Sequence, residues 1–409
     1  MKLTSGQGIA YDKIMKWIAD PSLGWKFVLA GYAGTGKTTL MQHIINNMET
    51  IPFCCAPTAK AASVLDKKLE NAIVTTVHKA LYSPIIPSSE GLKLLIASIA
   101  MAKNEKEKSE LQKEIEEEKK KMKKEKLQFS CKLRQGEYLG YVFVVDEASM
   151  ITPDMAEDFH FSGARVIFVG DPGQLPPVKA KEWFCKDGCD AMLTEITRQA
   201  LDSPIIRLSM EIREKGTCNY KNYFDCDEIT IAQKNKYDAV EWLKKDQVLV
   251  GSNNLRRRIN RYFRKQHENH ESVFPVNGEK LICLKNDMEN HGLINGLPAT
   301  CTNSEVDDFN DLRLSVLIDD ELKSDMIAYK YPFEIHYDKK ANELPWMLKQ
   351  DMVEFDFAYA ITVHKSQGSE WGDVLLADDG FMSTYGGQRK KWLYTAITRA
   401  KKTFTWIRD

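Results

Sequence analysis

The stretch GYAGTGKTTL, residues 31–40, restricts the folds open to this chain more than any other segment. A short apolar run, WKFVLA at residues 25–30, precedes it and predicts a buried strand. After the loop, apolar residues recur at helical spacing and predict a helix. In this order, strand, glycine loop and helix form a phosphate site, because the loop N–H groups converge on an anion at the positive end of the helix. We therefore predict that a nucleoside triphosphate is bound by Gly31, Ala33, Gly34, Thr35, Gly36, Lys37, Thr38 and Thr39.

A second strand signal supplies carboxylates for hydrolysis. YVFVVDEASM at residues 141–150 is a hydrophobic strand that runs directly into an acidic pair. Lys37 is expected to reach the β- and γ-phosphates, while Thr38 and Asp146 hold Mg²⁺. Glu147 is placed to polarise the attacking water, which a switch GTPase would not need. The pattern therefore predicts hydrolysis of the nucleoside triphosphate with Mg²⁺ as the metal.

A third strand, ARVIFVG at residues 164–170, ends in DPGQLPPV. By itself this segment is typical of a proline-rich turn. Beside a phosphate loop, the side-chain amide of Gln174 is placed to sense a γ-phosphate through hydrogen bonds.

Composition indicates where the protein is located but does not indicate what it binds. The 409 residues have a formal net charge of −1, so an anionic partner must be held by a local basic patch. No apolar run approaches the roughly 20 residues of a membrane helix, and the N-terminus lacks the apolar core of a signal peptide. The nine cysteines lie scattered, with Cys54 and Cys55 adjacent, which indicates reduced thiols. These features predict a cytoplasmic protein with no membrane partner, and the family resemblance stated below implies the cytoplasm of a bacterium or of a phage-infected host.

Four of the cysteines leave a metal site open. Their spacings fit no known zinc pattern, and the alternative is a set of small, half-buried thiols. The four are Cys185, Cys189, Cys218 and Cys226.

The ordered set of motifs resembles superfamily 1 DNA helicases of the RecD/Dda type, which form subgroup B and move 5′→3′ on single-stranded DNA. The similarity runs from residue 3 to about residue 402. The matching segments are LTSGQ (3–7, Q motif), the glycine loop (motif I), APTAKAASVL (56–65, motif Ia), TTVHKAL (75–81), DEAS (motif II), GDPGQLPPV (motif III), LTEITRQ (193–199, motif IV), FAYAITVHKSQGSEW (357–371, motif V) and LYTAITRAKK (393–402, motif VI).

The resemblance implies further nucleotide contacts. Gln7 would read the adenine edge, Gly368 would approach the nucleotide, and Glu370 would contact the ribose. Arg198 and Arg399 would reach the γ-phosphate from the other side of a cleft. A phosphate loop supplies positive charge on one side only, so two distant arginines make cleft closure depend on ATP, which is a physical basis for a motor.

Single-stranded DNA is held by phosphate contacts and by stacking of bases. A TVH triplet occurs twice, at residues 76–78 and 362–364, which favours two matching grips on one strand. NNLRRRINRYFRK, residues 253–265, predicts a basic helix, and both a solvated face and a DNA-contacting face remain open for it. The predicted nucleic-acid contacts are Pro57, Thr58, Lys60, Thr76, His78, Asn253, Thr362, His364 and Lys365.

The predicted fold class is α/β, with two RecA-like parallel-sheet motor domains, an inserted helical or wedge region (1B) and an SH3-like β domain (2B). Alternating apolar residues and Asn–Gly turns at 276–301 predict the β-structure of the last of these. The expected domains are 1A at residues 1–82 and 132–200, 1B at 83–131, 2A at 201–270 and 351–409, and 2B at 271–350.

A charged, low-complexity arm at residues 103–126 lies within the predicted insertion 1B. Glutamate and lysine at i,i+4 spacing predict a long exposed helix, and a hairpin with residues 91–105 is open. The resemblance places the strand-separating wedge here, although the family usually has a short β-hairpin. A wedge, a docking site for replication or recombination proteins, and a solvated spacer are all open.

The sequence therefore predicts an ATP-dependent DNA helicase that acts on single-stranded DNA and on junctions between single and double strands, working as a monomer. A translocase that strips proteins from DNA, and a helicase that acts on RNA, are the nearest alternatives. A nucleotide-dependent scaffold with vestigial hydrolysis is the alternative from another class. Whether the protein serves replication, recombination or repair is not readable from the residues.

Overall fold

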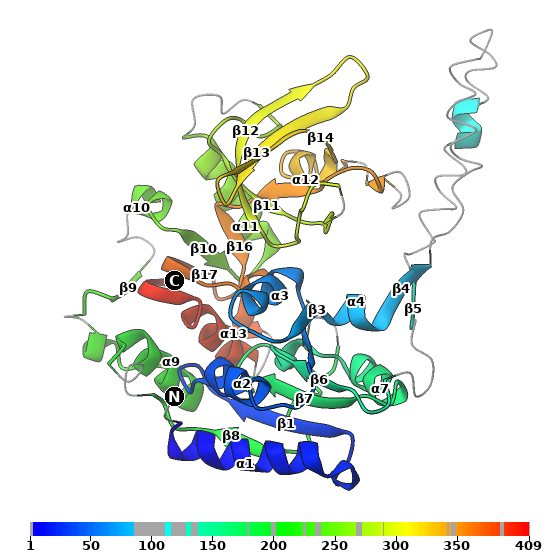
Figure 1. Ribbon diagram of the computed structural model, residues 1–409. Helices are drawn as coiled ribbons and strands as arrows, with labels where there is room; N and C mark the ends of the chain where they lie inside the picture. Colours follow the sequence, from blue (N-terminus) through cyan, green and yellow to red (C-terminus); the bar gives the residue numbers. More distant parts are fainter. Residues whose placement is uncertain are drawn as a thin grey trace. The chain divides into compact units, whose positions relative to one another are not determined.

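The computed structural model divides the chain into two compact units (Figure 1). The larger unit comprises Met1–Leu81, Leu133–Glu268 and Ala358–Asp409, and the smaller comprises Tyr82–Lys132 and Asn269–Phe357. Within the described residues, no helix is long and apolar enough to cross a membrane. The structure describes residues 3–85, 111–115, 128–131, 138–177, 180–197, 202–223, 226–233, 239–266, 272–288, 290–341, 343–344, 349–384 and 388–408.

The larger unit contains two parallel sheets, and we call each sheet with its helices a lobe. The first lobe has six strands in the order β3-β2-β6-β7-β1-β8, and every neighbouring pair is parallel. Its strands are β1 (Lys26–Gly31), β2 (Phe53–Ala56), β3 (Ile73–Thr76), β6 (Val142–Val145), β7 (Arg165–Gly170) and β8 (Ala191–Leu193). Its helices are α1 (Ser5–Ala19), α2 (Lys37–Ile45), α3 (Ala59–Asp66), α4 (Val77–Leu81), α7 (Pro153–Phe161) and the short 3-10 helices η1 (Pro21–Leu23) and η2 (Ala148–Met150).

Buried apolar residues fix the central strands of the first lobe. β6 is buried along its whole length and β7 is buried after its first residue, as expected for parallel strands covered on both faces. The helix α1 contributes Ile14 and Trp17 to a core shared with α2 and β1. The loops that leave the carboxyl ends of β1, β6 and β7 therefore lie at one edge of the sheet, where α/β proteins bind ligands.

The second lobe has five parallel strands in the order β16-β10-β17-β18-β9. The predicted basic helix is confirmed as α11, and its buried Asn260 joins it to the neighbouring strand β16, donating to the Ala360 carbonyl at 3.3 Å and accepting from the Ala360 N–H at 2.7 Å. The predicted α/β class with two parallel sheets is thus confirmed. The elements are α9 (Pro204–Lys215), η3 (Tyr220–Tyr223), β9 (Ile229–Gln233), α10 (Ala239–Leu243), β10 (Gln247–Val250), α11 (Asn253–Arg264), β16 (Ala360–Thr362), η6 (His364–Ser366), β17 (Trp371–Asp378), η7 (Phe381–Thr384), α13 (Gln388–Ile397) and β18 (Ala400–Arg408).

The smaller unit is built on an antiparallel sheet in the order β14-β13-β12-β11-β15. Buried aromatic side chains, Phe333, Phe355 and Phe357, fill its core. The predicted β-structure at 276–301 is present as β11 and the start of β12, with an isolated antiparallel bridge between Asp287 and Leu293. The domain boundaries given above remain predictions. The elements are β4 (Tyr82–Ile85), which pairs with β5 (Gln128–Cys131), then β11 (Lys280–Cys283), β12 (Pro298–Val306), β13 (Leu312–Ile318), β14 (Glu321–Ala328), α12 (Tyr331–Glu334) and β15 (Phe355–Phe357).

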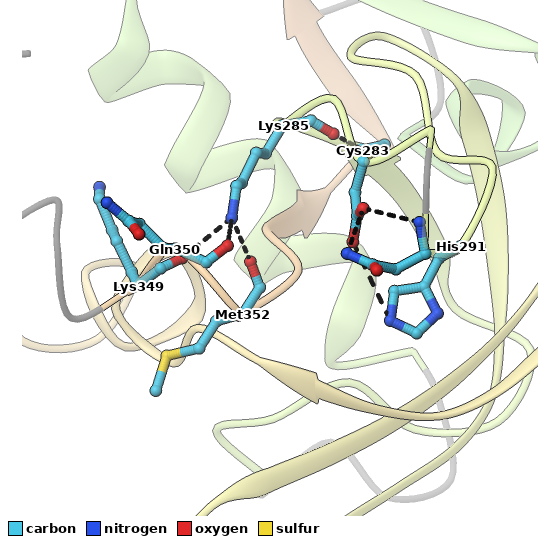
Figure 2. Close-up of polar contacts among 8 residues, drawn as sticks. Cys283, Lys285, His291, Lys349, Gln350 and Met352 are labelled. Carbon is cyan, nitrogen blue, oxygen red and sulfur yellow. Dashed lines mark hydrogen bonds and ion pairs between the residues drawn. The ribbon is translucent and has the colours of Figure 1, made fainter. Parts of the chain in front are cut away.

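The Lys285 side chain holds the segment that precedes β15 (Figure 2). Lys285 follows β11, and its ammonium donates to the backbone carbonyls of Lys349 at 3.0 Å, Met352 at 2.9 Å and Gln350. Burial lowers the pKa of Lys285, while the nearby Glu354 carboxylate opposes the shift. The three carbonyls therefore replace water around a partly buried cation, and they hold the segment before β15 against the sheet.

Two predictions fall largely or wholly outside the described residues. Of the arm at 103–126 and its partner segment at 91–105, the structure describes residues 111–115, which are helical. Arg198 belongs to the gap at 198–201.

Candidate nucleotide-binding and catalytic site

The loop between β1 and α2 takes a shape that its glycines permit. Gly34 and Gly36 have φ values of 79° and 75°, in the left-handed region that side chains with a Cβ disfavour. A Cβ at Gly36 would also collide with the Gln7 amide, and one at Gly31 would lie 2.9 Å from Thr35 Oγ1. The loop is therefore folded too tightly for larger residues at these positions, and α2 begins at Lys37, directly after it.

The Lys37 ammonium bonds to the loop itself. Its Nζ donates to the carbonyl of Gly31 at 2.8 Å and to that of Tyr32 at 3.0 Å. These neutral acceptors hold the charge at the mouth of the loop. Phosphate oxygens, which are charged acceptors, form stronger hydrogen bonds and can replace them.

The acidic pair lies where β6 ends. The Asp146 N–H donates to the Cys55 carbonyl at 2.9 Å, and Asp146 Oδ1 accepts from the Glu147 N–H at 2.9 Å. Glu147 has a φ of 50°, an unfavourable backbone conformation for a residue with a Cβ. Burial raises the pKa of Asp146, whereas the Glu147 N–H and the Lys37 charge lower it.

The pKa of Glu147 lies well above that of an ordinary carboxyl group. Burial and the neighbouring Asp146 raise its pKa to about 7, while Arg399 and Lys37 oppose the shift. A general base works best when its pKa lies near the operating pH. Glu147 is thus suited to accept a proton from water at neutral pH.

One cavity of about 520 Å³ collects these groups from both lobes. The first lobe contributes the loop, the acidic pair and Gln174, and the second contributes the segments around Gly368 and Arg399. The structure therefore brings together most of the residues predicted to handle the triphosphate. Of those predictions, the cavity wall includes Ala33, Gly34, Gly36, Lys37, Thr38, Thr39, Asp146, Glu147, Gln174, Gly368, Glu370 and Arg399.

Arg399 enters this cavity from the second lobe. It is 4% exposed, and its guanidinium donates to the carbonyls of Thr395 at 3.0 Å and Ser369 at 3.2 Å, and to Thr398 Oγ1 at 3.1 Å. The lobe that carries the arginine therefore also fixes its direction. Arg399 also opposes the raised pKa of Glu147, which places its charge near the proposed base.

Gln174 has an unused acceptor. Its side chain is 7% exposed, and Oε1 has no hydrogen-bond partner among the described residues. Buried amides are normally bonded. Because Gln174 lines the cavity, a bound water or ligand is the natural partner for this amide.

Gln7 bonds to the phosphate loop and to the start of its own helix. It is 4% exposed, and its amide nitrogen donates to the carbonyls of Thr35 at 3.0 Å and Gly36 at 3.4 Å, while its oxygen accepts from the Thr4 N–H at 3.0 Å. Both ends of the amide are thus bonded inside the first lobe, and Gln7 supports the phosphate loop. The adenine contact stays a prediction.

Two other predicted residues have contacts that the sequence did not suggest. Lys60, predicted to contact DNA, lines the nucleotide cavity, and its Nζ lies 5.2 Å from the centroid of the Trp371 ring. Glu370, predicted to contact the ribose, pairs with Lys401 at 3.1 Å. Both partners of this pair are largely exposed, so the pair contributes little to stability.

The repeated triplet makes the same hydrogen bond in both lobes, although it enters the α-helix α4 in the first and the 3-10 helix η6 in the second. Thr76 ends β3 and Thr362 ends β16, and each hydroxyl accepts the N–H of the lysine three residues later, at 3.1 Å for Lys79 and 3.3 Å for Lys365. Desolvation lowers the pKa of the histidine in each triplet, His78 and His364, so both imidazoles are neutral at pH 7.

The remaining nucleic-acid candidates lie at the starts of helices. Thr58, which follows Pro57, is the N-cap of α3, and its Oγ1 accepts from Ala61 N at 3.1 Å. Asn253 is the first residue of α11, and its Oδ1 accepts from Arg256 Nε at 3.1 Å. A Cβ at Gly368 would lie 3.4 Å from Thr58 Oγ1, so the segments that carry these two residues meet at the interface of the lobes.

The cysteines give no sign of a metal centre. Within the described part of the chain, no group of three or more His, Cys, Asp or Glu residues is arranged to hold a metal ion. Cys218 is buried, Cys189 is exposed, and Cys185 and Cys226 are partly buried. Burial and the neighbouring Cys189 raise the pKa of the Cys185 thiol to about 12.

The fold and the site define a P-loop protein with two parallel-sheet lobes around one cavity. The family model described as AAA domain matches residues 22–234, and the model described as UvrD-like helicase C-terminal domain matches residues 357–405. The first match covers more than half of the chain, so the protein belongs to the AAA domain family. The resemblance to superfamily 1 helicases of the RecD type is thereby confirmed at the level of family.

Curated relatives extend the match along the chain. The ATP-dependent RecD2 DNA helicase of Deinococcus radiodurans is 24% identical, over 92% of this chain and 46% of its own length. The uncharacterized protein R530 of Acanthamoeba polyphaga mimivirus is 31% identical, over 37% of this chain and 29% of the relative. The chain thus spans less than half the length of these two relatives.

Solved structures show the same fold. A Pif1 from Bacteroides, bound to single-stranded DNA, has a TM-score of 0.54 at 18% identity and covers 99% of this chain and 92% of its own. The Pif1 helicase of Candida albicans has a TM-score of 0.52 at 16% identity, with 100% and 94% covered. The two parallel-sheet lobes are thus the two RecA-like domains of this architecture.

Proposed function

We propose that this chain is an ATP-dependent DNA helicase that translocates 5′→3′ on single-stranded DNA and unwinds duplex DNA. One observation carries the proposal: Lys37, the Asp146–Glu147 pair and Arg399 line a single cavity although they come from two lobes. A site made by two lobes couples hydrolysis to their movement, because its charge stabilisation is complete only when both lobes contribute. The helicase relatives and the UvrD-like match support DNA as the substrate.

In the proposed mechanism the first lobe binds the triphosphate. The N–H groups of residues 33–38 and the Lys37 ammonium hold the phosphates. The Thr38 hydroxyl and the Asp146 carboxylate line the same cavity and are hard oxygen donors, which fits Mg²⁺. Mg²⁺ would neutralise charge that develops on the phosphate oxygens. Glu147 accepts the proton of the attacking water, and the Gln174 amide orients that water or the γ-phosphate.

The second lobe completes the site. Arg399 is held by its own lobe and points into the cavity, so its charge reaches the transferred phosphoryl group only when the lobes close. Arg198 is proposed to add a second positive charge. After hydrolysis the negative charge between the lobes is divided between two products, and the attraction that closes them weakens. Each cycle of closing and opening would then move one lobe relative to the other.

The single strand is proposed to cross both lobes along the repeated triplets. Thr76 and Thr362 end strands in their lobes, and the two lysines beside the histidines supply charge for phosphates. The neutral imidazoles of His78 and His364 offer flat surfaces for base stacking. None of these contacts reads sequence, as a motor on any DNA requires.

The direction of movement is tested with two tailed duplexes. With ATP, we expect the protein to unwind a duplex with a 5′ single-stranded tail much faster than one with a 3′ tail, and a blunt duplex is the control. The measurement is strand separation followed by fluorescence. Faster unwinding of the 3′-tailed duplex would contradict the proposed direction. ATP-driven displacement of a protein from tailed DNA, without strand separation, would instead identify a translocase.

The pH dependence of catalysis tests the role of Glu147. Its raised pKa of about 7 means that the base is protonated and inactive below that pH. We therefore expect kcat/KM for ATP to fall about tenfold per pH unit on the acid side of pH 7 and to level off above it, because kcat/KM reports the free enzyme. Steady-state ATPase rates between pH 5.5 and 9 provide the measurement. A flat profile through pH 6 would exclude Glu147 as the base that titrates.

A further inference from the structure

A tyrosine of the second lobe connects two loops of the first lobe. Tyr394 lies in α13 and is 1% exposed. Its hydroxyl donates to Asp171 Oδ2 at 2.6 Å and accepts from the Ala33 N–H, in the phosphate loop, at 2.8 Å. Burial and the Asp171 carboxylate raise the pKa of Tyr394 well above its ordinary value, so the hydroxyl keeps its proton at any physiological pH. One hydroxyl group therefore joins the two loops through hydrogen bonds.

The second of these loops, residues 171–175, is shaped around the tyrosine ring. A Cβ at Gly173 would lie 2.9 Å from Tyr394 Cε1, so only glycine leaves room for the ring. Asp171 Oδ1 accepts from the Gly173 N–H at 2.8 Å, while Oδ2 accepts the hydrogen bond of the tyrosine hydroxyl. The carboxylate thus fixes the backbone that carries Gln174, a residue of the nucleotide cavity.

Two more second-lobe side chains hold the end of the same loop. The Leu175 N–H donates to Thr395 Oγ1 at 3.0 Å, and the Leu175 carbonyl accepts from Gln367 Nε2 at 3.0 Å. Gln367 follows η6, the short 3-10 helix that contains His364 and Lys365, the proposed strand contacts. A continuous chain of hydrogen bonds therefore runs from the phosphate loop, through Tyr394 and residues 171–175, to the segment proposed to grip DNA.

We propose that Tyr394 is a positioning residue through which the nucleotide and single-stranded DNA change each other's affinity. The inference rests on the proposed function, since it assumes that both ligands bind. ATP between Lys37 and Gln174 sets the positions of Ala33 and of the 171–175 loop. Because Tyr394 is bonded to both loops, a shift of either loop moves α13. Gln367, which is bonded to Leu175, carries a shift of the 171–175 loop to the segment of His364 and Lys365. By reciprocity, bound DNA must change the affinity for ATP by the same factor.

The test compares Tyr394→Phe with the wild type and with Tyr359→Phe, which removes a hydroxyl from another buried tyrosine of the second lobe. The affinity for a fluorescent single-stranded oligonucleotide is measured by anisotropy, with and without a non-hydrolysable ATP analogue. We expect the wild-type affinity to change by about tenfold on adding the analogue, a typical coupling. Tyr394→Phe should bind each ligand alone but lose most of this change, whereas Tyr359→Phe should keep it.

A purely structural role gives a different result. It would weaken DNA binding with and without the analogue alike, and the ratio of the two affinities would stay as in the wild type. That outcome, or an equal loss in Tyr359→Phe, would overturn the inference. If the wild type binds no oligonucleotide or hydrolyses no ATP, the proposed function fails instead.

A second pair of variants covers the case in which Tyr394→Phe does not fold. Thr395→Val removes the acceptor of the Leu175 N–H, whereas Thr395→Ser keeps a hydroxyl there. We expect the valine variant to lose part of the coupling and the serine variant to retain it. Equal coupling in these two variants would count against the hydrogen-bond chain.

Discussion

Alanine at Lys37 should lower ATP turnover by roughly 10³-fold, the upper effect of removing one group that stabilises transition-state charge, and leave the protein folded. Among the described residues, Nζ donates to the Gly31 and Tyr32 carbonyls, which belong to its own loop. No core packing therefore depends on the ammonium. The measurements are steady-state ATPase rates with and without single-stranded DNA, and a thermal unfolding curve for each protein.

The matched control is Lys67→Ala. Lys67 is exposed at the C-cap of α3, in the same lobe, and does not line the cavity. Its loss removes the same charge from the surface, and the ATPase rate should stay close to that of the wild type. Turnover near the wild-type level in Lys37→Ala would contradict the assignment of the whole site, because the roles proposed for the other residues all require a triphosphate bound at this lysine.

Sequence was most informative where chemistry depends on a short, local pattern. The phosphate loop, the strand before it and the helix after it were all predicted, because their geometry is set by glycine freedom and hydrophobic spacing within about 20 residues. The acidic pair at the end of β6 was predicted for the same reason. The arginine of the second lobe was found only through the family resemblance. No local pattern relates Arg399 to Glu147, which the fold brings to the same cavity.

Sequence was less informative where a side chain has several available partners. It predicted an adenine contact for Gln7 and did not indicate that the amide bonds to Thr4 and to two loop carbonyls. It predicted a DNA contact for Lys60 and did not indicate that this lysine lines the nucleotide cavity, near Trp371. Tyr394 lies within the segment that resembles motif VI, but the sequence assigned it no role, because a tyrosine on a helix is most often core. Its role depends on a contact between lobes that no periodicity encodes.

Glutamine at Glu147 should bind ATP at least as tightly as the wild type and hydrolyse it roughly 10³-fold more slowly, within the range for loss of a general base. The amide has the same shape, so the unusual backbone at φ 50° and the packing around it need not change. It cannot accept the proton of water. Removing a negative charge beside Asp146 also lowers the repulsion that the phosphates meet.

Three measurements distinguish loss of the general base from loss of folding or of ATP binding. ATP should raise the melting temperature of Glu147→Gln by at least as much as it raises that of the wild type, because a ligand that binds only the folded state stabilises it. In single-turnover experiments the chemical step should be the slow one. The acid limb of the pH profile near 7 should also disappear, since the group with that pKa is gone. A variant with an unchanged hydrolysis rate would mean that another group activates the water, and Asp146, with its raised pKa, would be the next carboxylate to substitute.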